Sequence, residues 1–134
     1  MRPATLSLAL ALGLSPAALR ADEPIPVPSG QTVTWIDTIS DAQGPEGLTA
    51  RFRFLAPAIA REGGTVSLEA AHADMAFLCD TWVIPRLSGI GPQPVQVVVS
   101  LSDRPVPFGE ADPEATQFFE AYRPEDGLCV PEPY

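Results

Sequence analysis

The sequence predicts an α+β domain. Three segments of about seven to nine residues have the composition or the alternation of β-strands, one longer segment repeats apolar residues at helical spacing, and a helix-start signal follows the last strand segment. We expect a small antiparallel or mixed sheet of three to four strands packed on one main helix, with a short C-terminal helix and a disulfide-pinned tail.

The three predicted strands differ in how clearly they are marked. Residues 31–39 are rich in β-branched and aromatic residues, which strands favour. In residues 48–54, apolar side chains alternate with Thr49, Arg51 and Arg53, as in a strand with one buried face. Apolar positions alternate again along residues 95–101. Ahead of them, residues 22–30 carry three prolines and predict an extended lead-in that adds little to the core.

The main helix is predicted over residues 67–84. Ser67 is a suitable N-cap, and Glu69 lies in the first turn, where the helix dipole favours an acid. Apolar and sulfur-bearing residues then recur on one face, so Cys79 is expected to point inward. Pro85 ends or kinks the helix.

A second, shorter helix is predicted over residues 113–122. Asp112-Pro113-Glu114 provides an N-cap, a proline at the first helical position and an acid behind it. Residues 123–134 are then a proline-bearing tail, which Cys129 pins to the first helix.

Residues 1–21 have the three-part pattern of a secretory signal peptide: an early arginine, a short apolar run and then small residues. Cleavage after Ala21 or after Ala17 both fit, and the alternative is a buried N-terminal helix. The apolar run is shorter than the roughly 20 residues of a membrane-spanning helix. We therefore expect one soluble periplasmic domain, residues 22–134, with no membrane insertion of the mature chain.

The mature chain is strongly acidic. Six arginines against 17 acidic residues give a formal charge of −11 after residue 21, and there is no lysine. Nucleic acid and anionic membranes are poor partners for such a chain. The acidity also has a simpler interpretation, which is that it keeps an exported protein in solution.

Cys79 and Cys129 are the only cysteines. In an oxidising compartment an even pair is most simply a disulfide, and closing a loop of this length should stabilise the fold by roughly 4 kcal/mol. A redox-active or metal-binding pair is the alternative, but there is no Cys-x-x-Cys motif.

Few catalytic constellations fit the remaining residues. His72 is the only histidine, and a metal site drawn from Glu69, His72 and Met75 would be an incomplete donor set. The chain has no Gly-x-Ser-x-Gly turn and no lysine-bearing phosphate loop. We predict no metal, no cofactor and no catalytic residue.

Two features favour binding instead. Arg51 and Arg53 share the polar face of one strand and suit a carboxylate or phosphate, although pairing with an acid such as Asp37 would also account for them. Asp103 and Arg104 open a proline-stiffened loop, residues 102–110, which would serve either recognition or simple connection.

The segments RFRFLAP (51–57), GGTV (63–66), DMAFLC (74–79) and VSLSDRPVPFGEADPEATQFFE (99–120) resemble a family of small exported alphaproteobacterial proteins grouped as a domain of unknown function. The resemblance spans residues 24–129 and implies a Gram-negative, periplasmic setting. Some relatives carry the label acetolactate synthase. A chain of this size cannot enclose the thiamine diphosphate and flavin of that enzyme, and Glu125-Asp126-Gly127 does not replace its Gly-Asp-Gly motif.

The function expected from the sequence is therefore a non-catalytic binding or interaction module. Its partner would be an unknown exported protein or a small anionic ligand. The alternative is a small periplasmic enzyme using acidic residues, or a metal-binding protein. Clustered carboxylates around an apolar floor would favour the enzyme, and an arginine-lined surface would favour binding.

Overall fold

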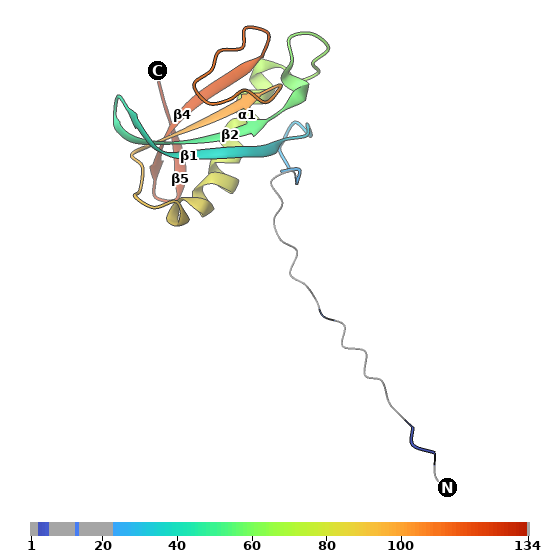
Figure 1. The fold of residues 1–134 in the computed structure, drawn as a ribbon. Helices are drawn as coiled ribbons and strands as arrows, with labels where there is room; N and C mark the ends of the chain where they lie inside the picture. Colours follow the sequence, from blue (N-terminus) through green and yellow to red (C-terminus); the bar gives the residue numbers. More distant parts are fainter. Residues whose placement is uncertain (1–2, 6–12, 14–22, 134) are drawn as a thin grey trace.

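The computed structural model describes residues 3–5, 13 and 23–133 of the 134-residue chain. Apart from residues 3–5 and 13, the predicted signal peptide lies outside this part. In the described part, five strands form one sheet in the order β1-β2-β3-β4-β5, and a helical layer lies behind it (Figure 1). The α+β class is confirmed, but the sheet has five strands rather than three to four.

The sheet is mixed because β2 and β3 run parallel, whereas every other neighbouring pair is antiparallel. Parallel neighbours need a crossover connection, and here the helical layer provides it. The strands are β1 (Thr34–Gly44), β2 (Gly47–Leu55), β3 (Gln96–Ser102), β4 (Gln117–Glu125) and β5 (Leu128–Glu132). The helical segments between β2 and β3 are η1 (Pro57–Ile59), α1 (Leu68–Leu78), η2 (Cys79–Val83) and η3 (Ile84–Gly89).

The inner face of the sheet and the inner side of α1 form the core. The alternation predicted for residues 48–54 is confirmed, since Phe52 and Phe54 are buried while Arg51 and Arg53 lie on the outer face. The fully buried side chains of the core include Phe52, Phe54, Val97, Val99, Leu101, Met75, Leu78 and Cys79.

The predicted main helix begins as expected but changes its winding. The Ser67 side chain accepts a hydrogen bond from the Ala70 N–H at 3.1 Å and caps α1. After Leu78 the chain forms a π-helical turn, η2, and then a 3₁₀ segment, η3. Pro85 has no N–H to donate to the Thr81 carbonyl, so the α-helical ladder cannot continue through this region.

The predicted C-terminal helix over residues 113–122 is wrong, because most of this segment belongs to strand β4. The Asp112-Pro113-Glu114 signal forms a turn instead: the Glu114 N–H donates to Asp112 Oδ1 at 3.0 Å, and the Ala115 N–H donates to the Asp112 carbonyl at 3.1 Å. Beyond the turn, Phe118 and Tyr122 pair with the inward positions of β3, and Phe119 pairs with outward-facing Ser100. The three aromatic side chains of this segment are of a type that strands favour.

The expected tail is more regular than predicted. It forms β5, which pairs with β4 through a hairpin whose turn residues, Asp126 and Gly127, have φ angles of 50° and 77°. Two consecutive positive φ angles are typical of the type I′ turn, for which Asp-Gly is a favoured pair. The predicted disulfide is confirmed: it joins Cys79 of the helical layer to Cys129 of β5.

The lead-in contributes more than the sequence predicted. The Ile25 N–H donates to the Val33 carbonyl at 2.7 Å, Ile25 and Val27 pack against the core, and Val33 is fully buried. The turn between them is held by the buried carboxylate of Asp74 on α1, which accepts hydrogen bonds from Ser29 and Gln31. Residues 25–33 are therefore an integral strap of the domain.

Candidate functional site

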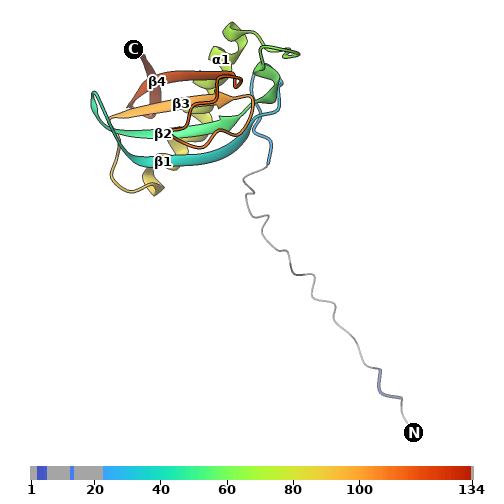
Figure 2. The ribbon, with the colours of Figure 1, turned by 45° about the horizontal axis from the view of Figure 1, so that its top comes forward.

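The loop between β3 and β4 crosses the outer face of the sheet, opposite the helical layer (Figure 2). Its base is closed by two hydrogen bonds: the Asp103 N–H donates to the Thr116 carbonyl at 3.0 Å, and the Thr116 N–H donates to Asp103 Oδ1 at 2.8 Å. A surface loop whose ends meet in this way is an Ω-loop, a type that is frequently functional. We call residues 103–116 the flap.

The Asp103 carboxylate at the base of the flap is only 4% exposed. Burial alone would raise its pKa, but hydrogen bonds from Arg104 and from the Thr116 N–H, with the charge of Arg104, outweigh burial and lower the pKa. In return, the hydrogen bond and charge of Asp103 raise the pKa of Arg104. Two of the predicted site residues therefore neutralise each other and anchor the flap.

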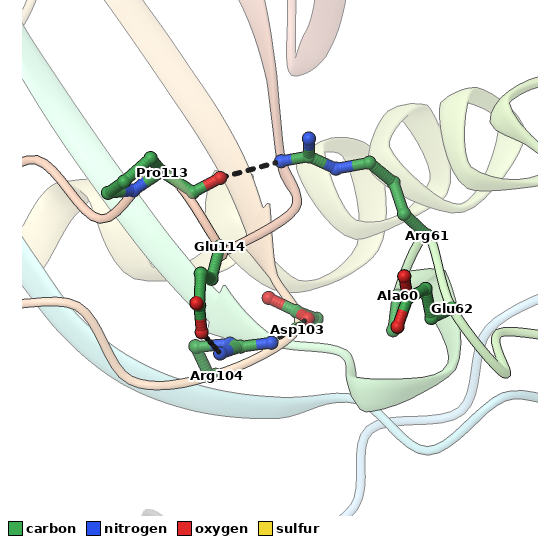
Figure 3. A pocket seen from close by; sticks show the side chains of 7 residues that line it. All are labelled: Ala60, Arg61, Glu62, Asp103, Arg104, Pro113 and Glu114. Atoms are coloured by element: carbon green, nitrogen blue, oxygen red, sulfur yellow. Dashed lines mark hydrogen bonds and ion pairs between the residues drawn. The ribbon is translucent and has the colours of Figure 1, made fainter.

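A cleft of about 340 Å³ lies at this anchor point (Figure 3). We call it the base cleft; its lining residues are Ala60, Arg61, Glu62, Asp103, Arg104, Pro113 and Glu114. The Arg61 side chain donates to the carbonyls of Pro113 and Ala115 and to Thr116 Oγ1. Arg104 lies 3.2 Å from Asp103 and 3.8 Å from Glu114. The side chains of Arg61 and Arg104 are thus both paired with residues of the flap, and the contacts in the base cleft hold the flap in place.

A second cleft, of about 310 Å³, lies between flap residues 106–110 and the outer face of the sheet. We call it the Arg51 cleft. The sheet contributes Arg51, Arg53, Val98, Ser100, Gln117 and Phe119. Arg51 and Arg53 therefore share one cleft, whereas Asp103 and Arg104 line the other.

Arg53 is already paired with other residues of the chain. Its Nη1 donates to Asp37 Oδ2 at 2.8 Å, its Nη2 donates to the Val106 carbonyl of the flap, and its side chain is only 12% exposed. Pairing with Asp37, the alternative to ligand binding, is therefore found for this arginine. Arg53 holds the flap on the sheet.

Arg51 has no such partner. Its guanidinium lies 5.8 Å from the centre of the Phe108 ring, a cation–π contact, and it makes no hydrogen bond or ion pair with any residue that the structure describes. The other described arginines all have polar partners: Arg53, Arg61, Arg86, Arg104 and Arg123. The donors of Arg51 thus remain available in the cleft.

Two phenylalanines border the same cleft and are unusually open to solvent. Phe108 is 52% exposed and Phe119 is 44% exposed. Neither is among the site residues predicted from the sequence, because Phe119 lies in the predicted helix over residues 113–122 and Phe108 in the predicted loop over residues 102–110. The apolar residues of segment 117–123 do not alternate with polar ones, so the local sequence carried no signal that placed Phe119 on the outer face beside Arg51.

His72 and Met75, two of the residues from which a metal site could be drawn, lie in different surroundings. His72 Nε2 of α1 lies 3.2 Å from Glu120 Oε1 of β4, while Met75 is fully buried in the core. Within residues 3–5, 13 and 23–133, no group of three or more His, Cys, Asp or Glu side chains is arranged to hold a metal ion. Nearby, burial and the charges of Glu120 and Asp80 raise the pKa of the Tyr122 hydroxyl.

Comparison with known proteins identifies the family of the chain but not its function. The family model described as "Family of unknown function (DUF6497)" matches residues 9–134, so the chain belongs to this family. Neither the curated proteins nor the solved structures contain a match to the chain.

Proposed function

We propose that this chain is an exported binding module that holds a small anionic ligand in the Arg51 cleft and does not catalyse a reaction. The observation that carries the proposal is the state of Arg51, whose guanidinium lines the cleft without a polar partner among the described residues. A planar guanidinium with five donors matches the two oxygens of a carboxylate.

The surroundings of Arg51 support binding through direct contact. Phe108 holds the guanidinium by a cation–π contact, which limits the side-chain entropy lost when a ligand binds. The cleft volume of about 310 Å³ suits a small molecule. Because the chain is acidic overall, long-range attraction does not favour an anion, so the affinity must come from the contacts of Arg51 itself.

Export is the second part of the proposal. A disulfide is typical of an oxidising compartment, and in the described part of the chain no helix is long and apolar enough to cross a membrane. The strap begins at Ile25, so signal cleavage at or before residue 21 would leave the fold intact. An intact mass of protein recovered from the periplasm tests this, and a full-length species retained in the membrane would contradict it.

Binding is tested by calorimetric titration of the purified protein with acetate, benzoate, inorganic phosphate and sulfate. We expect benzoate to bind, and Arg51→Gln to weaken it by at least about tenfold, the value of a charge-assisted hydrogen bond. Arg123→Gln is the matched control, because Arg123 is paired with Glu125 and Glu132 outside the cleft. Equal effects of the two substitutions would contradict the assignment of Arg51.

A further inference from the structure

The Arg51 cleft contains an acid as well as a free guanidinium. Glu110 is exposed and lines the cleft from the flap, two residues beyond Phe108. The chain turns there, since Gly109 has a φ of 83° and the Glu110 N–H donates to the Pro107 carbonyl at 3.0 Å. The carboxylate of Glu110 makes no hydrogen bond or ion pair with any described residue.

Arg51 and Glu110, which carry opposite charges, therefore line one cleft without pairing. Arg51 lies over the Phe108 ring instead of reaching Glu110. A ligand with only a negative charge would satisfy Arg51 and be repelled by Glu110. A ligand that carries both charges would satisfy both groups at once.

The rest of the cleft is suited to an apolar group. Val98 on its floor is almost fully buried, and the exposed rings of Phe108 and Phe119 border it. Covering these rings would remove apolar surface from water and favour a ligand with an apolar or aromatic body. The volume of about 310 Å³ is at the lower end for small-molecule sites, so the ligand is small.

We propose that the Arg51 cleft binds a free amino acid with an apolar or aromatic side chain. Its carboxylate pairs with Arg51, its ammonium group pairs with Glu110, and its side chain lies against Phe108 and Phe119. This ligand class rests on the anion-binding function proposed above and adds the requirement for a positive charge.

Three probes that share a phenylethyl unit separate the contributions: L-phenylalanine has both charges, 3-phenylpropionate has only the carboxylate, and 2-phenylethylamine has only the ammonium group. Each is titrated into ¹⁵N-labelled protein produced from the full chain, followed by amide shifts in two-dimensional NMR. The Gly109 amide reports on the flap, and unchanged spectra away from the cleft show that each variant is folded.

We expect L-phenylalanine to bind most tightly and 2-phenylethylamine most weakly. Glu110→Gln should weaken L-phenylalanine by about two- to fivefold, the upper part of the range for an exposed ion pair, and should not weaken 3-phenylpropionate. Arg51→Gln should weaken both carboxylates by at least about tenfold. Glu69→Gln, which removes an exposed acid of α1 outside this cleft, should change neither.

Different results would overturn the amino-acid assignment and the anion-binding function. If 3-phenylpropionate binds as tightly as L-phenylalanine and Glu110→Gln weakens neither, the amino-acid assignment is overturned while anion binding stands. If neither carboxylate shifts the cleft amides, or if Arg51→Gln has no effect, both the assignment and the anion-binding function are overturned.

Discussion

Asp74 is a buried carboxylate whose hydrogen bonds all lead to the strap. Its side chain accepts from the Ser29 N–H at 2.9 Å, from the Ser29 hydroxyl and from Gln31 Nε2 at 2.7 Å, and the residue is fully buried. A charged group in such a place is stable only while its partners remain. The residue therefore couples the N-terminal segment of the domain to α1.

Asp74→Asn should lower the free energy of unfolding by about 1.5–3 kcal/mol. The amide places an N–H₂ group against a donor from Ser29 or Gln31, so at least one buried hydrogen bond to a charged group is lost. Urea unfolding measures the change. Asp41→Asn, an exposed aspartate on β1, is the matched control and should stay within about 0.5 kcal/mol; a similar small value for Asp74→Asn would mean that the strap is held by its apolar contacts alone.

Asp103 gives the flap a dependence on pH. Its pKa is lowered in the folded chain, whereas an unfolded aspartate titrates near a pKa of about 4. The stability that Asp103 contributes is therefore fully present above about pH 4 and is lost as the pH falls through the lower folded pKa. Acid should loosen the flap before it unfolds the core.

The test is the free energy of unfolding of the native protein and of Asp103→Asn, measured between pH 2 and 6. We expect Asp103→Asn to be less stable by about 1–2 kcal/mol near pH 6, and the difference to shrink below pH 4. A difference that stays constant through this range would show that the ionised form of Asp103 contributes nothing.

The β4–β5 hairpin depends on a turn that only certain residues adopt. Gly127 has a φ of 77°, and a Cβ added there would meet nothing within 4 Å. Gly127→Ala should therefore lower the free energy of unfolding by about 1 kcal/mol through backbone conformation alone. Gly89→Ala is the matched control: a Cβ there has equally open space, the φ of Gly89 is not positive, and the change should be near neutral. Equal effects in urea unfolding would argue against a strained turn.

The β4–β5 turn is also a feature that the sequence did not predict correctly. Asp126-Gly127 is a strong local hairpin signal, but the prolines at 124 and 131 and the expected helix before them led to the prediction of a tail. Asp112-Pro113-Glu114, in contrast, predicted a helix where the structure has a turn. The hydrogen bond from the Glu114 N–H to the Asp112 side chain is the same at the start of a helix and in an isolated turn, so the local sequence does not distinguish the two. Strand β2 and the cap of α1 were predictable because their patterns are local and agree with the tertiary contacts.

The candidate site was predictable only in part. Period two places Arg51 and Arg53 on one face of β2, and this required no structure. Which arginine stays free depends on β1, where a register shift between Trp35 and Asp37 brings Asp37 opposite Arg53. A bulge of this kind re-aims the side chains after it, and neither its position nor the path of the flap can be derived from local patterns.

At the whole-molecule scale, the disulfide joins the helical layer to the edge of the sheet formed by β5. Strand β5 lies at the end of the sheet with β4 as its only strand neighbour among the described residues. Cys129 fastens it to Cys79 at the start of η2, and the Cys129 N–H donates to Asp80 Oδ1 at 2.8 Å. The bridge therefore joins the two layers at the end of the sheet opposite β1.

Replacing both cysteines, Cys79→Ala with Cys129→Ala, should lower the free energy of unfolding by roughly 2–5 kcal/mol, the range for removing a native disulfide from a small domain. Urea unfolding with and without reductant measures it: reductant should destabilise the native protein by a similar amount and leave the double variant unchanged. Hydrogen exchange should then show the β5 amides opening before those of β2 and β3, because β5 has lost its covalent attachment to the helical layer. A double variant as stable as the native protein, with β5 still protected, would show that strand pairing and the Asp80 hydrogen bond hold this edge without the bridge.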